Sequence, residues 1–168
     1  MKKPLIVYYS KNGTTEETVK RIKKETANEV ATLDLQSKER KIRGELLAQY
    51  EEIYIGCGIY MEKLPSPVVR FLLQNQEVLK NKRVILFLHG LISGANYPGI
   101  VEKSLKRCKA LAFERILYLG GKLDIREQNI FIRSLLSALA KKYNFDRNSA
   151  NNLIEEKITE LIKCFSPD

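Results

Sequence analysis

The sequence has little of what several function classes require. It contains no tryptophan, one histidine and three cysteines among 168 residues. The cysteines, Cys57, Cys108 and Cys164, stand too far apart for a zinc site or a CxxC redox pair, so we expect neither a metal site nor a dithiol centre. Runs of aromatic residues interleaved with basic ones are also lacking, and we therefore expect no nucleic-acid partner.

Long apolar segments are lacking too. The first apolar stretch, Leu5–Tyr9, is shorter than the apolar region of a signal peptide. No run approaches the roughly 20 apolar residues that span a bilayer. Together with unpaired cysteines, this predicts a cytoplasmic protein. Lys and Arg number 29 against 20 Asp and Glu, and the net charge of +9 favours anionic partners.

Short apolar runs alternate with amphipathic stretches along the chain. The runs predict strands at Leu5–Tyr9, Val30–Leu35, Ile53–Gly56, Val84–Leu88 and Ile116–Leu119, of which Val30–Leu35 alternates as an edge strand does. Helical spacing predicts helices at Thr15–Ala27, Pro67–Leu79 and Ile100–Leu111. This alternation predicts one α/β domain over residues 1–168. Its doubly wound five-stranded parallel sheet fits the order 2-1-3-4-5, with helices on both faces.

A helical insert at about 121–146 follows the fifth strand. Its apolar residues recur at spacings of three and four, and they are Ile125, Ile132, Leu135, Leu136, Leu139 and Tyr143. Such a stripe either packs on the edge of the sheet with its charges in water, or presents Arg126, Arg133 and Lys141 to an anionic substrate or lipid surface. The last helix is expected to begin at a cap formed by Asp146 or Asn148.

The loop after the first strand is rich in hydroxyl and amide groups. It reads Ser10, Lys11, Asn12, Gly13, Thr14 and Thr15. Because the following helix begins with unpaired backbone N–H groups and a positive dipole end, the loop suits a phosphate monoester. It lacks the Gly-Lys-Ser/Thr of a Walker loop and the three glycines of a dinucleotide fingerprint. Alternatively, Thr14 and Glu17 form a capping box that holds no ligand.

Two further loops should meet the first at the carboxyl ends of the strands. The candidate residues are Gly58, Ile59, Tyr60 and Met61 in one loop, and His89, Gly90, Gly94 and Tyr97 in the other. Glycines let the main chain approach a flat ring, while Tyr60, Met61 and Tyr97 either stack on it or only pack. His89 either handles a proton or bonds a neighbouring carbonyl, and Cys57 is interpreted as a small buried residue.

The first loop resembles the phosphate loop of the flavodoxin family. That loop reads aromatic, any residue, Ser or Thr, two variable residues, a small residue, any residue and Thr, which matches Tyr8 to Thr15 here. Val19 stands where an alanine is usual. The resemblance implies a flavodoxin-like fold with FMN as cofactor. The phosphate would lie on Ser10–Thr15 and the isoalloxazine ring between the two later loops.

The nearest resemblance is to the menaquinone-dependent protoporphyrinogen IX dehydrogenases of this fold. It rests on the segment Ile-Gly-Cys-Gly-Ile-Tyr at 55–60, the basic balance and the insert after the fifth strand. It implies an FMN oxidoreductase that passes electrons to a quinone or other acceptor, with catalytic residues unassigned. The implied redox partner is a quinone or a reductase protein. The basic insert, by its own sequence, is expected to touch the inner face of an anionic membrane. A carrier without its own organic substrate and a flavin-free module for a phosphate ligand are the alternatives.

Overall fold

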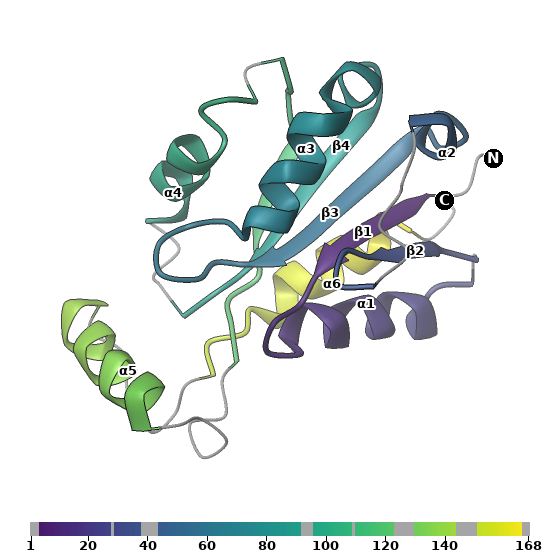
Figure 1. Ribbon diagram of the computed structural model, residues 1–168. Coiled ribbons are helices and arrows are strands. Elements are labelled where there is room, and N and C mark those ends of the chain that lie inside the picture. Colours follow the sequence, from purple (N-terminus) through teal and green to yellow (C-terminus); the bar gives the residue numbers. More distant parts are fainter. Residues whose placement is uncertain are drawn as a thin grey trace.

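The computed structural model describes residues 4–27, 29–37, 44–91, 96–108, 110–122, 130–143 and 151–165. Its centre is a five-stranded parallel sheet in the order β2-β1-β3-β4-β5 (Figure 1). The strands are β1 Leu5–Tyr9, β2 Ala31–Asp34, β3 Glu52–Gly58, β4 Arg83–His89 and β5 Arg115–Tyr118. The predicted fold class, strand order and edge position of the second strand are confirmed.

Helices connect the strands and cover both faces of the sheet. Their bounds are α1 Thr14–Glu25, α2 Gly44–Ala48, α3 Ser66–Leu79, α4 Tyr97–Ser104, α5 Ile130–Tyr143 and α6 Glu155–Lys163. The prediction for α4 was wrong at its end, since the helix stops at Ser104 rather than Leu111. Leu105 and Cys108 lie in the following turns yet are 8% and 3% exposed, so burial alone produced their helical spacing. The short α2 was not predicted.

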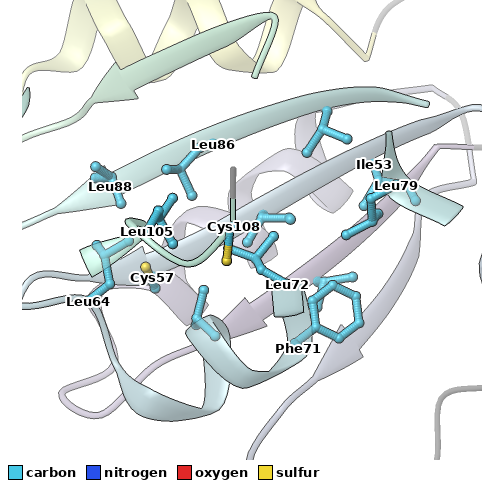
Figure 2. Close-up of a cluster of buried hydrophobic side chains, with 14 of the residues drawn as sticks. Ile53, Cys57, Leu64, Phe71, Leu72, Leu79, Leu86, Leu88, Leu105 and Cys108 are labelled. Atoms are coloured by element: carbon cyan, nitrogen blue, oxygen red, sulfur yellow. The ribbon is translucent and has the colours of Figure 1, made fainter. Parts of the chain in front are cut away.

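Two apolar cores lie on opposite faces of the sheet, because successive strand residues point to opposite sides. One core joins β3 and β4 to α3 and α4, and Figure 2 shows Leu86 and Leu88 of β4 above Leu72 of α3. The other packs α1 and α6 against the reverse face, with Ile22 of α1 and Leu161 of α6 both fully buried. Both faces of the central strands are therefore covered, as their continuous apolar runs predicted.

The last helix begins later than predicted. Asp146 and Asn148, the predicted caps, lie outside the described residues, and α6 starts at Glu155. Before it, Asn151 forms an antiparallel bridge with Lys122, and the Ile154 N–H donates to the Leu119 carbonyl at 3.0 Å. The chain therefore runs extended beside the end of β5 before it can turn into a helix.

The insert leaves and rejoins the sheet at one point, which we call the neck (residues 120–122 and 151–152). Besides the bridge, the Asn152 N–H donates to the Gly121 carbonyl at 2.9 Å, and the Gly121 N–H donates to Asn152 Oδ1 at 2.6 Å. Figure 1 shows α5 set apart from the sheet, on the side where the strands end, rather than packed along its edge. None of the described helices is long and apolar enough to cross a membrane.

Candidate functional site

The first loop is formed where β1 ends and α1 begins. Gly13 caps α1 with φ +84°, a left-handed conformation that favours glycine. The first intrahelical bond runs from the Glu17 N–H to the Gly13 carbonyl at 2.8 Å. The N–H groups of Thr14 and Thr15 therefore precede the helical ladder and have no carbonyl within it. This single glycine therefore produces both the sharp turn and the N–H groups that have no partner within the helix.

Polar side chains fix the conformation of the first loop through hydrogen bonds. Ser10 Oγ accepts a hydrogen bond from the Glu16 N–H at 3.1 Å, and the Gln36 side chain donates to the Ser10 carbonyl at 2.5 Å. The Thr14 hydroxyl donates to the Lys122 carbonyl at 2.9 Å, which joins the loop to the neck of the insert. The residue at the N-cap of α1 is Gly13 rather than Thr14, so the alternative of a Thr14–Glu17 capping box is wrong.

The second loop forms a tight hairpin after β3. Tyr60 and Lys63 exchange two backbone hydrogen bonds, of 2.9 and 3.0 Å. The two residues between them, Met61 and Glu62, have φ of +49° and +58°, which is uncommon for residues other than glycine. Met61 is 72% exposed at the tip. The hairpin therefore presents an apolar side chain to solvent at the carboxyl end of the sheet.

All three loops meet through backbone and tyrosine contacts. The Lys11 N–H donates to the Tyr60 hydroxyl oxygen at 3.0 Å, which joins the first loop to the second. The Ile59 N–H donates to the His89 carbonyl at 2.7 Å, which joins the second to the third. The three loops were expected to meet at the carboxyl ends of the strands, and in the structure they lie in contact there.

His89 is buried, with 2% of its surface exposed. Nδ1 lies 2.9 Å from the Gly120 carbonyl oxygen, and Nε2 lies 3.0 Å from the Thr18 hydroxyl. Because a carbonyl only accepts, Nδ1 carries the proton and Nε2 accepts from Thr18. Burial lowers the pKa of His89 to about 4, although the bond to Gly120 opposes that shift. The imidazole is therefore neutral near pH 7 and donates to a neighbouring carbonyl. Of the two interpretations of His89, this agrees with the one in which it bonds a carbonyl.

The third loop carries the remaining candidates. The Gly90 carbonyl accepts from the Tyr118 hydroxyl at 2.7 Å, and the Gly90 N–H donates to the Gly120 carbonyl at 3.1 Å. The Tyr97 ring stacks on the Tyr118 ring, with centroids 5.4 Å apart and planes 6° apart. One face of Tyr97 is thus already covered by protein. Gly94 lies outside the described residues.

Several residues that support the site were not singled out from the sequence. Thr18 holds His89, Gln36 holds the first loop, and Gly120 accepts from both His89 and Gly90. Thr18 is a polar residue on the buried face of α1 beside Val19 and Ile22, and the pair Gly120-Gly121 follows β5, so both positions could have been noticed in the sequence. Gln36 left no such signal.

The donors of the first loop fit a phosphate monoester. The N–H groups at the start of α1 and the exposed Lys11 supply donors and positive charge, while Glu16 pairs with Lys20 at 2.5 Å. Nothing lies within 4 Å of the place where a Cβ on Gly13 would stand, and the neighbouring Asn12 is exposed, so the loop is open to a ligand on the side of Gly13. In the described part of the chain, no group of three or more His, Cys, Asp or Glu side chains could hold a metal ion.

Comparisons with known structures find proteins of the same fold. Oxidised Flavodoxin 2 from Bacillus cereus is similar, with TM-score 0.55 and 20% identity over 97% of both chains. A flavoprotein in complex with FMN from Lactobacillus acidophilus has TM-score 0.53 and 17% identity over 70% of this chain and 93% of its own. An NADPH-quinone reductase from P. pentosaceus has TM-score 0.51 and 12% identity, covering 90% and 99%. These identities establish the fold alone.

A comparison with curated protein sequences finds no match. The family model described as "Flavodoxin domain" matches residues 5–149, which include the whole sheet and all three loops of the site. With that match, the strand order and the phosphate-type first loop, the chain belongs to the flavodoxin domain family.

Proposed function

We propose that this chain is an FMN-binding oxidoreductase whose first loop holds the cofactor's phosphate. The observation that carries the proposal is the turn at Gly13, which frees the N–H groups of Thr14 and Thr15 at the carboxyl end of β1. That position lies beside the point where the sheet reverses its winding, since β1 is flanked by β2 and β3. The FMN complex of the Lactobacillus flavoprotein, which shares the fold, supports the same ligand.

The remaining loops supply the surroundings of a flat ring. Backbone groups of Gly58–Met61 and the main chain of Gly90 lie at the carboxyl ends of neighbouring strands, joined by the Ile59–His89 bond. Bound FMN supplies hydride or electron transfer between an organic donor and an acceptor such as a quinone. The chain's own groups would bind and orient it, and neutral His89 would brace the main chain rather than donate a proton.

Titration with FMN and with riboflavin tests the cofactor directly. We expect the purified protein to quench FMN fluorescence with a Kd much lower than for riboflavin, because only FMN carries the phosphate. A protein that stays colourless and binds no added FMN contradicts the proposal and leaves a flavin-free module. The assay needs no substrate, so it stands apart from any question of turnover.

A matched pair of charge variants locates the phosphate. Asn12→Asp adds a negative charge on the exposed first loop with almost no change of shape. Since two charges about 4 Å apart in water interact by about 1 kcal/mol, FMN binding should weaken by roughly fivefold and riboflavin binding should not. Asn81→Asp makes the same change in the turn before β4, at the other end of the sheet, and should alter neither. Equal weakening of both ligands would place the phosphate elsewhere.

We further propose a protoporphyrinogen-type substrate, with a quinone as acceptor. The basic residues Arg133 and Lys141 of α5 are exposed, and they could attract the propionates of such a substrate. Lys142 pairs with Glu62 of the hairpin, so the insert reaches the second loop of the site. This contact favours an enzyme with its own organic substrate over a plain electron carrier.

Removal of the insert distinguishes an enzyme with its own organic substrate from a plain electron carrier. Because Lys122 and Asn151 are bridged, a short Asn-Gly turn can replace residues 123–150 without parting the ends of the sheet. The shortened protein should still bind FMN, while oxidation of protoporphyrinogen with a quinone should be lost. Full-length protein that carries FMN but shows no such turnover, and is instead reduced by a reductase protein, would be an electron carrier.

We also propose that the insert rests on anionic membranes. Ile130 at the start of α5 is 84% exposed, and basic residues stand along the same helix. Each Lys or Arg near an anionic surface gains about 1 kcal/mol. Sedimentation with vesicles of phosphatidylcholine and phosphatidylserine should recover the full chain but not the shortened one. Equal recovery of both would refute a role for the insert.

A further inference from the structure

We propose that the Tyr60 hydroxyl competes with the phosphate of FMN for the backbone donors of the first loop, and thereby sets the affinity for the cofactor. The inference deepens the proposed function and rests on it. In the structure the phenol oxygen of the second loop accepts the Lys11 N–H at 3.0 Å, a contact between residues 49 positions apart. A donor of the phosphate loop is thus already engaged by a side chain of the protein.

The path of the Tyr60 ring is fixed by its surroundings. The hairpin bonds between Tyr60 and Lys63 hold its backbone. The ring then crosses Gly58, where an added Cβ would lie 2.7 Å from both the ring Cζ and the hydroxyl oxygen. Any other residue at position 58 would push the ring off the loop. The Lys11 ammonium lies 5.8 Å from the ring centroid, a favourable cation–π position that adds a second contact.

The phenol is a weaker acceptor than a phosphate. Burial raises the pKa of Tyr60, and the backbone N–H groups of Lys11 and Asn12 oppose that shift only in part. Tyr60 is therefore neutral at pH 7, whereas phosphate is an anion and forms charge-assisted hydrogen bonds about twice as strong. FMN can displace the hydroxyl, but its net affinity is lowered by the bonds that must break.

Tyr60→Phe removes the acceptor and keeps the ring. A neutral hydrogen bond contributes about 0.5–1.5 kcal/mol net, so FMN should bind roughly twofold to tenfold more tightly to the variant. Riboflavin, which has no phosphate, should bind both proteins equally. In the ligand-free variant the Lys11 amide should exchange its hydrogen faster than in the parent protein. Tyr54→Phe is the control, because Tyr54 bonds Glu52 at the start of β3, far from the loops, and it should change none of these values.

The outcomes distinguish a failure of FMN binding from a failure of the competition by Tyr60. Parent protein that binds no FMN defeats the proposed function. If the parent protein binds FMN but Tyr60→Phe binds it equally well or more weakly, only the competition is refuted. The hydroxyl would then either leave the backbone donors untouched or help to hold the ligand. A Lys11 amide that exchanges at the same rate in both proteins also refutes the competition. Thermal unfolding of each variant verifies that the fold is intact.

Discussion

Acidification should destabilise this protein through its single histidine. The His89 pKa of about 4 in the folded protein is below its ordinary 6.5, because the ring is buried. In the unfolded chain His89 gains a proton as the pH falls through about 6.5, whereas in the folded protein it stays neutral until about 4. The unfolded state therefore binds more protons in this window, and the stability rises with pH.

The size of the effect follows from the shift. The stabilisation from His89 is fully present above about pH 6.5, and roughly 2 kcal/mol of it is lost by pH 5 and about 3 kcal/mol by pH 4. Denaturant unfolding at a series of pH values measures it, provided that the carboxylates are accounted for. His89→Gln supplies that correction, since the variant lacks the titrating group and keeps the carboxylates. Between pH 5 and 6.5 its stability should depend less on pH than that of the parent.

NMR gives an independent test, because the ring resonances of the single histidine need no assignment among several. A folded-state His89 that titrates near pH 6.5 would refute the account, as would equal pH dependence in His89→Gln and the parent. Either result would mean that water or a third group reaches the ring and that the bonds to Thr18 and Gly120 do not hold it neutral.

Further substitutions test other parts of the fold by denaturant unfolding. Gly120→Ala should cost at least about 2 kcal/mol and open the neck, because φ is +70° and the new Cβ would lie 1.9 Å from the Asn152 carbonyl oxygen. Leu72→Ala, at a fully buried site, should cost about 3 kcal/mol, whereas Leu46→Ala at a 39% exposed site should cost under about 0.5. Arg83→Ala removes ion pairs to carboxylates on both sides, of 2.7 and 2.6 Å. At 41% exposure its cost should stay near 1 kcal/mol or less, and high salt should reduce it.

The sheet could be predicted from the sequence because its strands are buried on both faces. A continuous apolar run such as Val84–Leu88 has few other uses in a chain of this size. Helix ends were harder, since Leu105 and Cys108 are buried beyond the end of α4 and Ile154 is partly buried before the start of α6, each at a spacing that a helix would also produce. At these positions the spacing of apolar residues reflects which side chains are covered by the core, and it does not reflect a helix.

The candidate site, like the fold, was predictable in one part and not in another. The first loop was predictable because its residues are consecutive and its geometry is local, with Gly13 as the turn. The contacts of Tyr60 with Lys11 and of Thr14 with Lys122 join residues 49 and 108 positions apart. Hydrogen bonds of this kind depend on where the loops end in space, which residue types in a single sequence do not encode.

The pairing of α1 with α6 has a consequence for the order in which the protein folds. One of the two cores joins the earliest and the latest parts of the described chain on the central strands: Ile6 and Ile22 lie in one cluster with Ile158 and Phe165, and Arg21 reaches Glu155 at 2.9 Å. During synthesis the apolar stripe of α1 has no such cover until α6 has left the ribosome. Long-range contacts of this kind slow folding and expose apolar surface meanwhile. A nascent chain of this protein would thus depend most on chaperones during translation of its last helix.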